Sequence, residues 1–200
     1  MTIVELLLRT QSLLGQLGDE AASAEHKERL VVAADALSFI MKIGQAHGLE
    51  AYLEDCAVQG PPLVLMAFNT LGEAEFWMNN HPDPPHHANV LIAGEYFLTV
   101  YDPSTGHRAV LHDPVLAYYL EEMIHEGLPA PVAAFHTYEE ATRWLYSQPE
   151  PPRQVFITVA GEYFLAVYHY KVRLRALYPI SMAAKNVQRG PEVPTTSEPP

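Results

Sequence analysis

Two identical runs of Gly-Glu-Tyr-Phe-Leu carry the side chains best suited to chemistry. They place Glu95 beside Tyr96, and Glu162 beside Tyr163. Two carboxylates at a defined separation can cleave a glycosidic bond, one as acid and the other as base or nucleophile. The pair therefore suggests a hydrolytic or small-ligand site shared by the two runs. The simpler interpretation is two solvated turns, each followed by a strand whose aromatic residues pack a sheet.

Three histidines fall in one proline-rich loop, at His81, His86 and His87. Imidazole nitrogen suits zinc or copper, but adjacent histidines at the start of a strand point to opposite sides, which favours a solvated loop. The chain has no glycine-rich phosphate loop and no dinucleotide fingerprint. We therefore predict no metal, no cofactor and no catalytic residue.

Charge is distributed unevenly along the chain. Residues 1–162 hold 7 Lys/Arg and 22 Asp/Glu, whereas residues 163–200 hold 5 and 2. Lys171, Arg173 and Arg175 alternate with apolar residues, so we expect them on one face of the last strand. There they could bind an anion or an acidic partner, or protect a sheet edge from aggregation.

Acidic doublets recur at Glu54-Asp55 and Glu121-Glu122. They predict either an acidic surface for a basic protein partner or ordinary solvated helix faces. The formal net charge of −12 argues against binding to a nucleic-acid backbone, which requires clustered cations.

The elements that position these residues are duplicated. With an offset of 67, residues 49–109 (copy one) match residues 116–176 (copy two) at 25 of 61 positions without a gap. Thr70-x-x-Glu73 and Thr137-x-x-Glu140 have the spacing of a capping box, which predicts a helix start in both copies. The Ala-Gly-Glu runs predict tight hairpins in which Gly94 and Gly161 adopt positive φ.

The pattern predicts an α+β protein built from an N-terminal helical pair and two tandem α-β-α-β-β-β repeats with mainly antiparallel sheet. The predicted parts are the helical pair at 1–48, repeat unit 1 at 49–112, repeat unit 2 at 113–180 and a disordered tail at 181–200. Whether the repeats form one sheet or two is left open.

The segment "AFHTYEEATRWLYSQPEPPRQVFITVAGEYFLAVYH" resembles a group of uncharacterised paralogous proteins of myxobacteria. The motifs F-x-T-x-x-E-A and AGEYFL-x-VY carry the likeness, and both copies contain them. The resemblance implies no catalytic residues. By analogy with paralogue groups that neutralise toxins, it implies an immunity-type antidote.

We therefore expect a non-catalytic protein-binding module that presents an acidic surface to a basic partner. The alternative is a small-ligand-binding protein or hydrolase with a pseudo-symmetric site between the repeats, and a homodimer joined at sheet edges is a further one. The single cysteine, Cys56, and the absence of a long apolar run indicate a cytoplasmic protein that does not enter the membrane.

Overall fold

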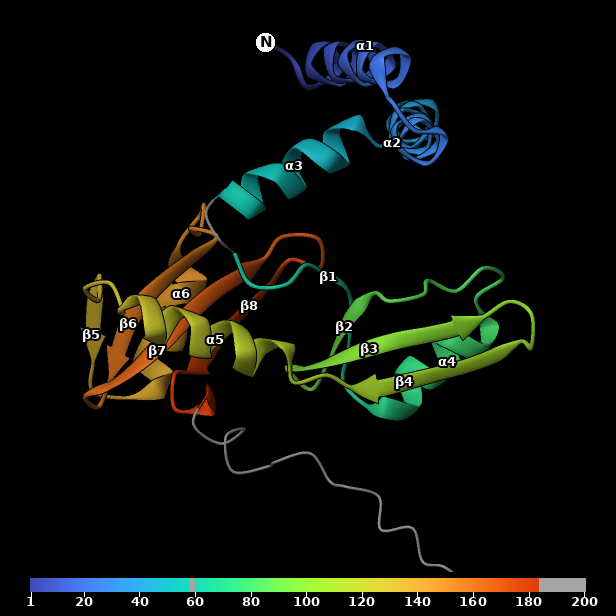
Figure 1. Cartoon of the computed structure of the whole chain (residues 1–200). Coiled ribbons are helices and arrows are strands. Elements are labelled where there is room, and N and C mark those ends of the chain that lie inside the picture. The colour runs from blue at the N-terminus through green and yellow to red at the C-terminus, as the bar shows by residue number, and fades with distance from the viewer. Residues whose placement is uncertain (58–59, 184–200) are drawn as a thin grey trace, which may run out of the picture. The chain divides into compact units, whose positions relative to one another are not determined.

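The computed structural model describes residues 1–57 and 60–183, which form six helices and eight strands (Figure 1). The chain divides into two compact units, residues 1–59 and 60–200. The division falls eleven residues after the start of copy one as the sequence delineates it. The first helix of copy one therefore belongs to the first unit.

The first unit is helical, as predicted for residues 1–48. It consists of α1 (Ile3–Glu20), α2 (Ala24–Lys42) and α3 (Ala46–Ala57). Thr2 and Glu5 form a capping box at the start of α1, and the Ser23 side chain caps α2. These bonds satisfy backbone amides that have no partner within the helix.

The first unit has a small core. Ile3, Leu7 and Ala46 are buried together, and Leu37 and Met41 pack against them. The Gln11 side chain donates to the Ala34 carbonyl at 2.9 Å, which ties α1 to α2. None of the residues of α2 is buried, and its contribution to this core consists of the partly buried Leu37 and Met41.

The second unit contains two four-stranded sheets, which settles the question that the sequence left open. The elements of copy one are β1 (Val64–Phe68), α4 (Leu71–Asn80), β2 (Asn89–Ile92), β3 (Glu95–Asp102) and β4 (His107–His112). The elements of copy two are α5 (Val115–Glu126), β5 (Ala133–Phe135), α6 (Tyr138–Ser147), β6 (Gln154–Val159), β7 (Glu162–His169) and β8 (Leu174–Pro179). The α+β prediction and its element order are confirmed.

Both sheets have the same topology, with orders β1-β2-β3-β4 and β5-β6-β7-β8. The first two strands of each sheet are parallel, and the other neighbours are antiparallel. A parallel pair needs a long crossover, which α4 supplies in copy one and α6 in copy two. The antiparallel strands follow through short turns.

The capping prediction is confirmed in both copies. The Thr70 hydroxyl accepts from the Glu73 amide, and the Thr137 hydroxyl accepts from the Glu140 amide, each at 3.2 Å. The returning glutamates differ slightly from the predicted box, because they accept from the residue before the cap. Glu73 accepts from the Asn69 amide at 2.8 Å, and Glu140 from the His136 amide at 3.0 Å.

The second sheet is covered on opposite faces by α5 and α6 (Figure 1). On the α5 face, Leu116 and Leu120 pack with Leu165, and this cluster also takes in Leu91 and Tyr96 of the first sheet. On the α6 face, Leu145 packs with Ile157. The two copies therefore share part of one core within the second unit.

The first three residues of the predicted disordered tail, 181–183, are described by the structure and are ordered. Ala183 is buried in the core shared by the copies. Residues 184–200, the rest of the predicted tail, lie outside the described residues.

Candidate functional site

The two Ala-Gly turns have matching geometry. Gly94 and Gly161 have φ of 86° and 84°, as predicted, and Ala93 and Ala160 precede them at 50° and 51°. Two consecutive residues with positive φ form the turn whose twist suits a two-residue hairpin. In both copies the following glutamate is the first residue of the outgoing strand and is exposed.

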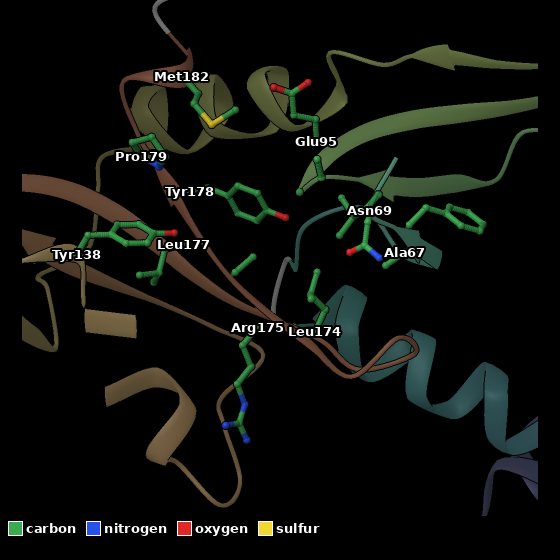
Figure 2. Close-up of a pocket in the computed structure, with 15 residues that line it drawn as sticks. Ala67, Asn69, Glu95, Tyr138, Leu174, Arg175, Leu177, Tyr178, Pro179 and Met182 are labelled. Atoms are coloured by element: carbon green, nitrogen blue, oxygen red, sulfur yellow. The ribbon is translucent and has the colours of Figure 1, made fainter. Parts of the chain in front are cut away.

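A pocket of about 500 Å³ lies in the second unit between elements of the two copies (Figure 2). Copy one contributes the end of β1, Asn69 and the β2–β3 turn with Glu95. Copy two contributes Tyr138 and β8 with Tyr178, and Met182 follows β8. In Figure 2 the Tyr178 ring lies among the labelled residues, and its hydroxyl is directed toward the side on which Asn69 lies.

The pocket is not the pseudo-symmetric site that the sequence suggested. Glu95 lines it, but Glu162, Tyr96 and Tyr163 do not. The Glu162 carboxylate instead accepts from the Ser181 hydroxyl at 2.6 Å. The pocket joins the hairpin turn of one copy to the last strand of the other, so equivalent residues do not face each other across it. The expected pair of carboxylates is therefore wrong for this pocket.

Tyr96 and Tyr163 belong to the core that the two copies share. Tyr96 is buried, and its hydroxyl donates to the Pro62 carbonyl at 3.1 Å. Tyr163 is half-buried and packs against the same core. Their phenol rings contribute apolar burial at the place where the copies meet.

A buried polar pair supports the wall of the pocket. Nε2 of His169 and the Tyr178 hydroxyl lie 2.9 Å apart, and both side chains are buried. Burial lowers the pKa of His169 to about 4 and raises the pKa of Tyr178 above its usual value. Both groups are therefore neutral near pH 7, and their hydrogen bond holds the Tyr178 ring in place.

The predicted row of cations on the last strand is wrong. Lys171 and Arg173 lie in the turn between β7 and β8, and only Arg175 is on the strand. The Arg173 backbone has a φ of 52°, which an extended strand cannot include. The equivalent residue in copy one is Gly106, which also has a positive φ, of 71°. The glycine at the equivalent position of copy one was thus a sequence signal for a turn.

Arg175 caps a helix. Its guanidinium donates to the Tyr146 carbonyl at 2.6 Å and to the Gln148 carbonyl at 2.8 Å, at the end of α6. Arg108, the equivalent residue, donates to the carbonyls of Met78 and Asn79 at the end of α4. These bonds satisfy carbonyls that the helix leaves unpaired, and they place a cation at the negative helix end.

The acidic doublets are divided between the two units. Glu54 and Asp55 lie on α3, where Glu54 is exposed and Asp55 is buried. Glu121 and Glu122 lie on α5 and are exposed. On α5 they share the outer face with Tyr118, which is 61% exposed, and with Glu126. The structure therefore shows one open acidic face on α5, with an aromatic residue beside it.

The histidine loop is held by hydrogen bonds to backbone amides of the loop and of β3. The His81 ring accepts from the Asp83 amide at 3.2 Å, and the His86 ring from the Tyr101 amide at 3.1 Å. Within residues 1–57 and 60–183, no group of three His, Cys, Asp or Glu residues is arranged to hold a metal ion.

Sequence reasoning missed four residues of the site: Asn69, Tyr138, His169 and Tyr178. His169 and Tyr178 lie on the neighbouring strands β7 and β8, where the register pairs His169 with Leu174 and Tyr178 with Leu165. The two are therefore not opposite each other, and they meet only through their side chains in the folded protein. Asn69 and Tyr138 flank helix starts that the sequence predicted, but nothing in the repeat indicates that they line one pocket. Their meeting depends on how the copies pack.

Comparison with protein-family models, with curated proteins and with solved structures finds no match for this chain. Among the described residues, no single helix has the length and apolar composition to cross a membrane, and α2 and α3 meet that criterion only as a pair bent by 116°.

Proposed function

We propose that the protein is a non-catalytic module that binds a basic protein partner, as an immunity-type antidote does. The outer face of α5 carries this proposal. It presents Glu121, Glu122 and Glu126 around the exposed ring of Tyr118. Carboxylates steer a basic partner to the surface, and a central tyrosine supplies apolar contact, a residue type enriched among those that dominate interface energies.

The test is capture from native lysate at low and at high salt, followed by mass spectrometry. The expected result is retention of a basic protein that is released at high salt, because salt screens attraction between exposed charges. A variant carrying Tyr118→Ala, Glu121→Gln and Glu122→Gln should lose this protein.

The matched control is Asp83→Asn with Glu150→Gln, which removes two exposed charges from loops. This control should retain the partner. Retention that is indifferent to salt, or equal loss in both variants, contradicts binding through the α5 face.

The pocket between the copies favours a second candidate function, the binding of a small ligand. Its volume lies within the usual range for ligand sites, roughly 300–1,000 Å³. The hydrolase form of this alternative loses its main support, because Glu95 has no second carboxylate opposite it among the residues that line the pocket.

A further inference from the structure

Few charged residues line the pocket between the copies. The charged residues that line it are Glu95 and Arg175. Arg175 uses its guanidinium on the carbonyls of Tyr146 and Gln148, and in Figure 2 this side chain extends away from the other labelled residues. Glu95 is exposed, and within the described chain its carboxylate forms no salt bridge. The charge offered to a ligand is therefore negative.

The walls of the pocket are aromatic and apolar. Tyr178 and Tyr138 lie on the side of copy two, together with Leu177 and Met182. Tyr138 is 53% exposed, so part of its ring remains open to a ligand. The faces of tyrosine rings attract cations, and the apolar side chains suit a carbon chain or ring. Asn69 adds an amide that can donate and accept hydrogen bonds.

A metal ion fits this pocket poorly. Such ions are held by several oxygen, nitrogen or sulfur ligands, and no cluster of three His, Cys, Asp or Glu residues occurs in the part of the chain that the structure describes. An organic cation needs only one carboxylate for its charge, because the remaining contacts can be aromatic and apolar.

We propose that the pocket binds an organic cation, an ammonium or guanidinium group on an apolar body. Glu95 pairs with the charge, and Tyr138 and Tyr178 contact the body. The cation is either a free amine or the Lys or Arg side chain of a protein. In the second case the proposal deepens the proposed function, since a basic partner would then use the pocket as well as the α5 face.

The duplication supplies a matched control for Glu95. Glu162 follows the same Ala-Gly turn in copy two, is also exposed, and does not line the pocket. A glutamine at position 162 can still accept from Ser181. Glu95→Gln and Glu162→Gln therefore change the net charge and the turn residue equally, but only Glu95→Gln removes a carboxylate from the pocket.

The experiment titrates the full chain with phenethylamine and with its uncharged counterpart, phenethyl alcohol, and follows binding by NMR and calorimetry. The expected result is saturable binding of the amine that weakens about tenfold or more in Glu95→Gln, because the amine loses its charge-assisted hydrogen bond to the carboxylate. Glu162→Gln should change the affinity by less than about twofold, and the alcohol should bind as weakly as the amine binds to Glu95→Gln.

Two further arms identify the source of the cation. Agmatine represents a free guanidinium compound, and the blocked amino acids N-acetyl-lysine and N-acetyl-arginine methylamide represent a protein side chain. Preference for agmatine indicates a free ligand, and preference for the blocked residues indicates a protein partner. Tyr138→Leu should weaken whichever probe binds, and unchanged circular dichroism checks the fold of each variant.

Absence of saturable binding by every cationic probe overturns the proposal, as does an equal effect of Glu95→Gln and Glu162→Gln. Neither outcome bears on the α5 face, which is tested by the salt-dependent capture of a protein by the unaltered chain and the loss of that protein in the Tyr118 variant. The pocket and the proposed function can therefore fail independently.

Discussion

Leu98 of copy one and Leu165 of copy two are equivalent residues on β3 and β7, but they have different surroundings. Leu165 is fully buried beneath α5, whereas Leu98 is half-buried. On the neighbouring strands, Leu111 is 53% exposed while its equivalent, Tyr178, is 4% exposed. In copy two, α5 packs on the sheet of its own copy and covers Leu165. A duplicated sequence can thus repeat its elements without repeating their packing.

The largest expected effect tests this comparison directly. Leu165→Ala should lower the free energy of unfolding by roughly 2–5 kcal/mol, because it removes a fully buried side chain and leaves a cavity. Leu98→Ala should cost about 1 kcal/mol or less, since less apolar surface is lost from the core. Urea unfolding of both variants provides the measurement, and equal losses would show that the exposed face of the first sheet is covered in solution.

A second expected effect concerns position 169 and its equivalent, Asp102. His169 is neutral in the folded protein because burial lowers its pKa from 6.5 to about 4. The free energy of unfolding is therefore highest above pH 6.5. It falls as the pH falls toward 4, because His169 binds a proton in the unfolded chain at a higher pH than in the folded protein. The loss should approach about 3 kcal/mol.

Asp102 should act over a lower range of pH. Hydrogen bonds from Ser104 and Thr105 lower its pKa from 3.8 to about 2, so its contribution is lost as the pH falls from 3.8 toward 2. His169→Gln should flatten the stability profile between pH 6.5 and 4, and Asp102→Asn should leave that range unchanged. Thermal unfolding across pH separates them, and a wild-type profile that is flat between pH 6.5 and 4 would contradict the burial of His169.

The smallest expected effect concerns a feature that both copies share, the arginine at the end of a helix. Arg108→Ala and Arg175→Ala should each lower the free energy of unfolding by about 1–2 kcal/mol, because each frees carbonyls at the end of a helix and both side chains are only half-buried. Calorimetric melting of the two variants and of Arg173→Ala gives the comparison. Arg173, exposed in its turn, should have little effect, and an equal loss in all three variants would contradict the capping role of Arg108 and Arg175.

Local features could be predicted from the sequence with good success. The Thr70 and Thr137 caps and the glycine turns were predictable because each depends on interactions among residues a few positions apart. The element order followed from the repeat for the same reason. The row of cations was mispredicted because alternation along a chain resembles a strand, even where one residue adopts positive φ.

The candidate site was less predictable. Glu95 was singled out, but its expected partner Glu162 does not line the pocket, and Tyr138 and Tyr178 do. The hydrogen bond between His169 and Tyr178 joins side chains that are not opposite each other in the β7–β8 register, and neither residue stands out by type or spacing. Side chains from distant segments meet only once the copies pack together.

The sequence by itself determined the duplication, the helix caps, the hairpin turns and the acidic charge of the chain. The caps and turns depend on local backbone preferences, so they are the same in both copies, and the charge follows from composition alone. Only the tertiary structure decided that the copies form two sheets, that α5 covers one of them, and that Glu95 rather than Glu162 borders the pocket. Burial is a property of the whole packed unit, and two equivalent residues can therefore have different chemistry.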